Sequence, residues 1–235
     1  MDGFTRFNRD IDFVFCIDMT GSTFHFGRRF AEKLDSICDC AKSTLDEFGA
    51  EISSFRIRLI LFYDDETEGE NAILESRFFS IPEEISLAKD FIFNAPCGGG
   101  GDLSENGLEA LYYAMLSDFV TTPKCRQFIF LFTDSDALPL KARQGFPGYP
   151  TDMVDENRFF ETWIGARGDI NLSLNNKYKR MVLFAPAETK YEELSANFER
   201  CCFVPIEPSN SLNDIILPDV LVELFKMGFS GGGFY

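Results

Sequence analysis

The chain contains 235 residues, enough for one large α/β domain or two small ones. Hydrophobic residues make up 45% and charged residues 26%, as in ordinary globular proteins that bury a sizeable core. A formal net charge of −16 repels phosphate backbones and anionic lipids, so we expect no binding to nucleic acid or to a membrane surface.

The first ten residues, MDGFTRFNRD, are polar and charged where a signal peptide is apolar. No run in the sequence approaches the ~20 apolar residues that a membrane-spanning helix needs. Seven cysteines without a C-x-x-C pair are typical of reduced, structural thiols. The sole histidine, His25, leaves too few ligands for a typical zinc site. These features together predict a cytoplasmic protein.

The first half of the chain alternates between apolar strands and amphipathic helices, a pattern typical of parallel α/β sheets. Residues 11–18 (IDFVFCID) predict a first strand, and apolar residues at helical spacing predict a helix that ends near Gly49. Residues 55–63 predict a second strand, and residues 77–81 a short edge strand. Pro82 suits a first helical turn and predicts a helix through about Phe93.

The second half continues this alternation. A helix is expected after the glycine run 98–101, and residues 126–133 predict a strand covered on both faces. Prolines and glycines predict a long loop over residues 137–153, and such loops are often functional. The remaining expected elements are a helix at 155–165, a strand at 179–185, a helix at 191–200, a strand at 201–206 and a closing helix at 212–227.

The chain shows no linker or internal repeat before its glycine-rich end. We therefore predict one domain over residues 1–227, followed by a flexible tail over residues 228–235. The expected fold is a three-layer α/β/α sandwich around a mainly parallel sheet with Rossmann-type topology. The sequence leaves the oligomeric state open.

Three short segments carry the oxygen atoms that favour a binding site. Asp18-Met19-Thr20-Gly21-Ser22 follows the first strand, Asp134 ends the strand at 126–133, and Asp102 follows the glycine run. The carboxyl ends of parallel strands meet at one edge of the sheet, where open α/β proteins bind ligands. Carboxylates and hydroxyls form a hard, oxygen-only donor set that suits Mg²⁺, Mn²⁺ or Ca²⁺.

The D-x-T-x-S segment alone would favour simple capping of a helix N-terminus. The two further acidic segments favour a metal instead, because clustered carboxylates repel one another and a bound cation resolves that conflict. We predict one divalent cation, Mg²⁺ first with Mn²⁺ or Ca²⁺ as alternatives. Its expected ligands are Asp18, Thr20, Ser22, Asp102 and Asp134.

In their order and context, these segments resemble the von Willebrand factor A family with its metal-ion-dependent adhesion site, over roughly residues 10–206. DMTGS is similar to the family's D-x-S/T-x-S loop and FTDSD to its strand-end aspartate. GGGGDLSE resembles the G-G-G-D-x-x-E loop of a bacterial and alpha-kinase-associated branch. FYDD resembles the Y-R-D segment of that branch, with Asp64 in place of the arginine. Integrin-like members have a threonine where this chain offers Asp102, which makes the site more negative.

The resemblance also implies a function. In the family, the remaining metal position is filled by water or by a carboxylate of a protein partner. This implies a non-enzymatic, metal-dependent interaction module, an adaptor or scaffold in bacterial signalling or stress response. The loop 137–153 and the acidic turn 64–70 would border its docking surface.

A phosphoester hydrolase or phosphotransferase of the haloacid dehalogenase type is the alternative, because its nucleophilic aspartate also ends the first strand. Asp18 would then be the nucleophile. That chemistry normally has a second aspartate two positions later, where this chain has Thr20, and a lysine near a later strand end, which is missing near Asp134. The glycine run lacks the G-x-G-x-x-G spacing of a phosphate-binding loop.

Overall fold

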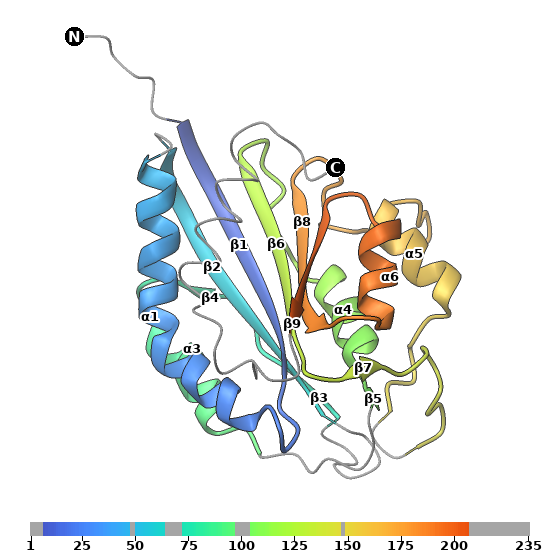
Figure 1. Cartoon of the computed structure of the whole chain (residues 1–235). Coiled ribbons are helices and arrows are strands. Elements are labelled where there is room, and N and C mark those ends of the chain that lie inside the picture. Colours follow the sequence, from blue (N-terminus) through green and yellow to red (C-terminus); the bar gives the residue numbers. More distant parts are fainter. Residues whose placement is uncertain (1–6, 48–49, 64–71, 97–103, 147–148, 207–235) are drawn as a thin grey trace, which may run out of the picture.

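The computed structural model describes residues 7–47, 50–63, 72–96, 104–146 and 149–206 (Figure 1). These residues form a mixed α/β fold around a mostly parallel sheet with the strand order β3-β2-β1-β6-β8-β9. The parallel strands are β1 (Phe7–Asp18), β2 (Ala50–Phe62), β6 (Cys125–Phe132), β8 (Lys179–Pro186) and β9 (Cys201–Ile206). The predicted mixed α/β class with a mainly parallel sheet is therefore confirmed.

Two short strands pair with β2 at one edge of the sheet. β3 (Ile73–Glu75) and β4 (Phe79–Ser80) both pair antiparallel to it. β4 lies within the predicted edge strand at 77–81, whereas the sequence pattern does not predict β3. A three-residue strand is too short to show a period of two.

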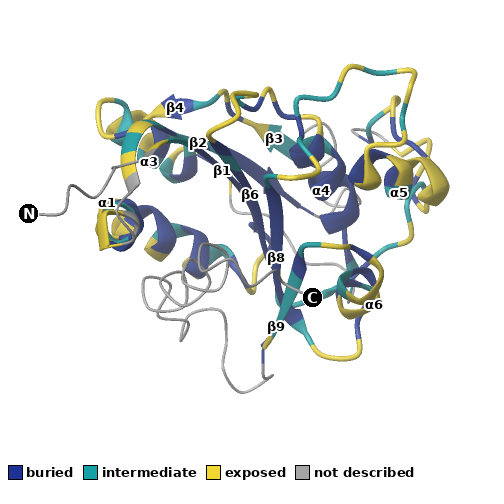
Figure 2. Ribbon diagram, turned by 90° about the horizontal axis from the view of Figure 1, so that it is seen from above, coloured by how far each residue is buried: buried dark blue, intermediate teal, exposed yellow. Residues whose placement is uncertain are grey.

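Helices cover both faces of the sheet (Figures 1 and 2). Successive side chains of a strand point to opposite faces, so Phe13 and Phe15 of β1 belong to one core cluster and Val14 and Cys16 to the other. The first cluster packs against α1 (Phe24–Glu47) and α3 (Ile85–Phe93), and the second against α4 (Gly107–Met115), α5 (Glu156–Ile164) and α6 (Lys190–Asn197).

The core is rich in aromatic side chains, as expected from a composition with 27 phenylalanines. The rings of Phe128 and Phe130 stack with centroids 5.9 Å apart, and those of Phe132 and Phe184 stack at 4.7 Å. Phe15 of β1 stacks on Phe130 at 5.1 Å. These contacts tie β1, β6 and β8 together and fix the positions of their ends.

The helix predicted to end near Gly49 is α1, which begins at Phe24, directly after the turn that follows β1. The start of the next helix differs from the prediction. Pro82 lies in a turn over residues 81–84, and α3 begins only at Ile85. The Ile81–Pro82 peptide bond is cis, and Pro82 belongs to the turn rather than to the helix.

Several predictions fall outside the described residues, namely the closing helix at 212–227, the tail at 228–235 and the acidic turn at 64–70. The one-domain division accordingly stays a prediction. In the part of the chain that the structure covers, no helix is long and apolar enough to cross a bilayer.

Candidate functional site

Asp18 ends β1 at the carboxyl edge of the sheet, and its side chain is completely buried. One carboxylate oxygen, Oδ1, accepts hydrogen bonds from the Thr20 amide at 3.0 Å, the Thr20 hydroxyl at 2.7 Å and the Thr23 hydroxyl at 2.9 Å. The other, Oδ2, accepts from the Thr133 hydroxyl at 2.7 Å. Hydroxyl groups from two separate loops thus surround one buried carboxylate.

The loop after β1 is a tight turn that leads straight into α1. Asp18 bonds the amide two residues ahead, the pattern of an Asx turn. The carbonyl of Thr20 accepts the amides of Thr23 at 3.1 Å and Phe24 at 2.9 Å, which begins the helix. The D-x-T-x-S segment therefore forms the start of α1 and also presents its polar side chains at the sheet edge.

A second contact joins this loop to the one after β6. The Ser22 hydroxyl donates to Oδ1 of Asp134 at 3.1 Å, and the neighbouring Ser135 hydroxyl donates to the same oxygen at 3.2 Å. Ser22 is exposed and Asp134 is half-buried, so this side of the site faces solvent. The structure thus brings together four of the five predicted ligands: Asp18, Thr20, Ser22 and Asp134. Asp102 and the glycine run lie outside the described residues.

The electrostatic environment disfavours the charge of Asp18. Burial raises the pKa of its carboxyl, the hydrogen bonds from Thr20 and Thr133 lower it, and the nearby charge of Asp134 raises it further. A cation beside Asp18 and Asp134 would stabilise both carboxylates in their ionised form.

One buried polar atom near Asp18 has no hydrogen-bond partner among the described residues. It is the hydroxyl of Tyr191, on α6. The Tyr191 hydroxyl lies against Gly107, where a Cβ atom would stand only 2.0 Å away. Burial raises the pKa of Tyr191, and the charge of Asp18 adds to this effect. The interior wall of the site is therefore polar but incompletely hydrogen-bonded.

Neighbouring acidic residues fix the elements around the site. Asp136 accepts hydrogen bonds from the Ala137 amide at 2.7 Å and from the Lys190 amide at 2.9 Å, which anchors the start of α6. Glu109 is buried on α4 and accepts from the Tyr149 hydroxyl at 2.7 Å. The predicted long loop is thereby held against α4. The loop starts within β7 (Asp136–Ala137), which pairs in parallel with β5 (Ser104–Glu105).

The hydrogen-bond directions bear on whether a metal ion fits. A hydroxyl that donates its one hydrogen keeps its lone pairs available for a cation. The Thr20 hydroxyl donates to Asp18 and the Ser22 hydroxyl donates to Asp134, so both oxygens can accept a cation. Among the described residues, no three His, Cys, Asp or Glu side chains gather in a metal-binding arrangement. The donor set that is present consists of hydroxyl and carboxylate oxygens, which fits a hard cation such as Mg²⁺.

Three residues around Asp18 are missing from the predicted set: Thr23, Thr133 and Tyr191. Thr133 precedes the strand-end aspartate in FTDSD, so its position offered a signal. Thr23 falls one position beyond the D-x-T-x-S pattern. Tyr191 comes near Asp18 only through the packing of α6, and a local motif carries no information about such packing.

The sequence matches no protein-family model and no curated protein. Among solved structures, the fold is similar to two crystal structures of the pilus adhesin SpaC from Lactobacillus rhamnosus GG. The TM-scores are 0.52 and 0.53, at 10% sequence identity over 94% of this chain. The chain spans only 31% and 30% of the adhesin chains. Proximal thread matrix protein 1 from the mussel byssus has a TM-score of 0.47 at 12% identity, over 93% of this chain and 48% of its own.

Proposed function

We propose that this chain is a von Willebrand factor A-type module that holds one divalent cation and docks a protein partner through it. The observation that carries the proposal is the Ser22 to Asp134 hydrogen bond of 3.1 Å beside the buried carboxylate of Asp18. The finer architecture belongs to the same proposal. Helices on both faces of a mainly parallel sheet make a three-layer α/β/α sandwich with Rossmann-type topology.

In this proposal the hydroxyls and the carboxylates have different tasks. Thr20 and Ser22 would contact the cation through the lone pairs that their hydrogen bonds leave free. Asp18 and Asp134 would orient these hydroxyls and supply negative charge. Asp102 joins the ligand set by the resemblance alone. Mg²⁺ usually keeps several water ligands, and a carboxylate of the partner would replace one of them.

The environment of Asp18 favours this binding role over the phosphotransferase alternative. A nucleophilic carboxylate must reach a phosphorus atom with a free oxygen. Both oxygens of Asp18 accept hydrogen bonds from threonine hydroxyls, and the side chain is completely buried. The position suits a structural carboxylate that orders the loops around it.

The wider role follows from the resemblance to the bacterial and alpha-kinase-associated branch. We propose an adaptor or scaffold function in cytoplasmic signalling or stress response, with Mg²⁺ as the physiological ion.

The decisive experiment measures thermal unfolding with Mg²⁺, Mn²⁺ or Ca²⁺ and with a chelator. A ligand that binds only the folded state at about 100 times its Kd adds about 2.7 kcal/mol to stability. We expect Mg²⁺ to raise the melting temperature of the parent chain and of Asp39→Asn, which removes an exposed carboxylate on α1. Asp134→Asn, which removes the charge beside Ser22, should lose this response.

Two results would contradict the proposal. An unchanged melting temperature at high concentrations of Mg²⁺, Mn²⁺ and Ca²⁺ would show that the chain has no cation site. Hydrolysis of a generic phosphoester by the purified chain, lost in Asp18→Asn, would establish the enzyme instead. Capture of a partner that a chelator releases, and that Asp134→Asn does not bind, would support the docking role.

A further inference from the structure

A second polar cavity lies at the amino end of β8, at the edge of the sheet opposite the cation site. Its volume is about 380 Å³, within the range of small-molecule sites. It opens between α5, the turn before β8 and the turn after α6. The residues that line it include Trp163, Asn176, Lys179, Asn197, Glu199 and Arg200.

Lys179 is the central charge of this cavity. Its side chain is buried, with a relative exposure of 3%, yet it forms no ion pair among the described residues. Its ammonium group donates to Oδ1 of Asn176 at 2.6 Å and lies 4.1 Å from the centre of the Trp163 ring. A cation–π contact and one amide oxygen offset only part of the cost of burying a charge.

Arg200 supplies a second cation from another element. It lies in the turn between α6 and β9 and has a φ of +65°, a strained conformation for this residue type. Its carbonyl accepts the Met181 amide at 3.0 Å, which ties the turn to β8. Within the described structure, the guanidinium group of Arg200 has neither a hydrogen bond nor an ion pair. Two cations without carboxylate partners therefore face one cavity.

Basic side chains lie close together around this cavity, although the chain carries a net charge of −16. Burial and then the charge of Arg200 lower the pKa of Lys179 to about 8, and the opposing effect of Glu199 is smaller. Arg180, on the other face of β8, shows the same influence. Burial, Arg200 and Arg126 lower its pKa to about 10.

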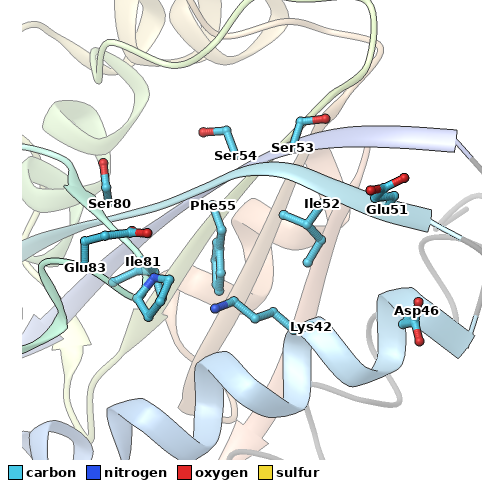
Figure 3. Close-up of a pocket in the computed structure, with 11 residues that line it drawn as sticks. Lys42, Asp46, Glu51, Ile52, Ser53, Ser54, Phe55, Ser80, Ile81 and Glu83 are labelled. Carbon is cyan, nitrogen blue, oxygen red and sulfur yellow. The ribbon is translucent and has the colours of Figure 1, made fainter.

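Another cavity of the same fold has a different balance of charges (Figure 3). A larger cavity of about 560 Å³ lies between α1, β2 and the turn before α3. It also contains one lysine, Lys42, whose ammonium group lies 5.8 Å from the centre of the Phe55 ring. Three carboxylates line that cavity, those of Asp46, Glu51 and Glu83, so its charge balance is negative. The cavity around Lys179 has two cations and one carboxylate, and is suited to an anion.

We propose that the cavity between Lys179 and Arg200 binds a phosphate group, either free or carried by a small molecule as a monoester. A phosphate monoester carries a charge of about −1.5 to −2 at neutral pH, which matches two cations. Lysine acts on phosphate as a compact charge, and arginine as a planar fork of donors. The cavity also exceeds the space that a phosphate group needs, which leaves room for an organic remainder.

The location makes this site independent of the proposed cation site. Lys179 is the first residue of β8, whereas Asp18 and Asp134 lie at the carboxyl ends of β1 and β6. Phosphate binding should therefore persist with a chelator present and in Asp134→Asn. Failure of one proposal leaves the other standing.

The position of Trp163 provides a direct measurement, because it is the only tryptophan in the chain. Its ring contacts Lys179, so a phosphate group at that ammonium should change its fluorescence. The titrant is inorganic phosphate in one series and glycerol 3-phosphate in a second, near neutral pH and at constant ionic strength set with sodium chloride. We expect a saturable change with one site per chain and a Kd tighter than about 1 mM.

Substitutions assign the binding to this cavity. Arg200→Gln should weaken binding by about tenfold or more, and Lys179→Met should abolish it. Lys177→Gln is the matched control, because Lys177 is exposed, lies 5.4 Å from the Tyr178 ring centre and does not line the cavity. If Lys179→Met fails to fold, Arg200→Gln against Lys177→Gln decides the question.

The two titrants distinguish the source of the phosphate group. Tighter binding of inorganic phosphate indicates the free ion, and tighter binding of glycerol 3-phosphate indicates a monoester. A fluorescence change that sodium chloride alone reproduces, or equal affinities in Arg200→Gln and Lys177→Gln, would overturn the proposal.

Discussion

The Ser22 hydroxyl lies 3.1 Å from Oδ1 of Asp134, although the two residues are 112 positions apart in the chain. The contact exists because β1 and β6 are parallel neighbours whose carboxyl ends meet at the same edge. It brings the loop after β1 and the loop after β6 into one polar site. The proposed cation position depends on this contact more than on any other.

Ser22 should matter for cation binding more than for folding, because its side chain is exposed. We expect Ser22→Ala to weaken Mg²⁺ binding by about tenfold or more, measured by calorimetry, because the proposed site loses one of its ligand oxygens. Ser135→Ala is the matched control, since Ser135 donates to the same Asp134 oxygen at 3.2 Å without belonging to the predicted ligand set. Equal weakening in both variants would show that Asp134, rather than Ser22, determines the affinity.

Thr133 should stabilise the fold through its hydrogen bond to the buried carboxylate of Asp18. Thr133→Val keeps the shape of the side chain and removes the hydroxyl, so it should lower the free energy of unfolding by about 1–3 kcal/mol. Thr133→Ser, which keeps the hydroxyl, should lose less. Urea unfolding with an unchanged m value measures the difference. A Val variant as stable as the parent chain would show that the bond to Asp18 is dispensable.

Gly107 and Tyr191 should behave as a coupled pair. Gly107→Ala places a Cβ 2.0 Å from the Tyr191 hydroxyl, so we expect a loss of about 1–3 kcal/mol from overpacking. Tyr191→Phe removes a buried hydroxyl that has no hydrogen-bond partner within the described part of the chain, so it should be neutral or stabilising. The double variant should regain most of the lost stability, because the nearest remaining ring atom lies at 3.1 Å. Additive effects in urea unfolding would contradict this packing.

Lys179 should make the fold more stable as the solution becomes alkaline. Burial lowers its pKa from 10.5 to about 8, so between these values the unfolded chain binds a proton that the folded chain lacks. The contribution of this residue to the free energy of unfolding therefore rises with pH from about 8 to 10.5. Urea unfolding at about pH 7 and about pH 10 measures it.

The variants isolate this effect from other groups that titrate in the same range. Lys179→Met should lack the alkaline gain that the parent chain and Lys177→Met both show. If the free energy of unfolding of the parent chain and of Lys179→Met depends on pH in the same way, the folded chain does not lower the pKa of Lys179.

The larger elements and the site edge follow from local patterns. Long apolar runs predict β1, β2, β6 and β8, and parallel strands necessarily bring their ends together at one edge. This geometry explains the hydrogen bond between Ser22 and Asp134. It could be expected from the sequence, because polar residues follow both strands. Elements of two or three residues, such as β3 and β5, show no period that a sequence pattern can reveal.

The polar environment of Asp18 is less visible in the sequence. Thr133 and Tyr191 come near it through strand pairing and helix packing, which are long-range effects. The cavity around Lys179 is a similar case. Trp163, Lys179 and Arg200 belong to three separate elements, and none of them lies in a recognisable motif. A buried lysine without an ion-pair partner among the described residues becomes evident only when the folded chain shows which side chains surround it.

The central position of β1 has a consequence for biosynthesis. This strand pairs with β2 on one side and with β6 on the other. Asp18 accepts a hydrogen bond from Thr133, which lies 115 residues later in the chain. On the ribosome, β1 and β2 emerge long before β6 does, so the edge of β1 that later pairs with β6 has unpaired backbone groups during synthesis. The nascent chain should therefore depend on chaperones until β6 has left the exit tunnel, and a chain cut before β6 should aggregate.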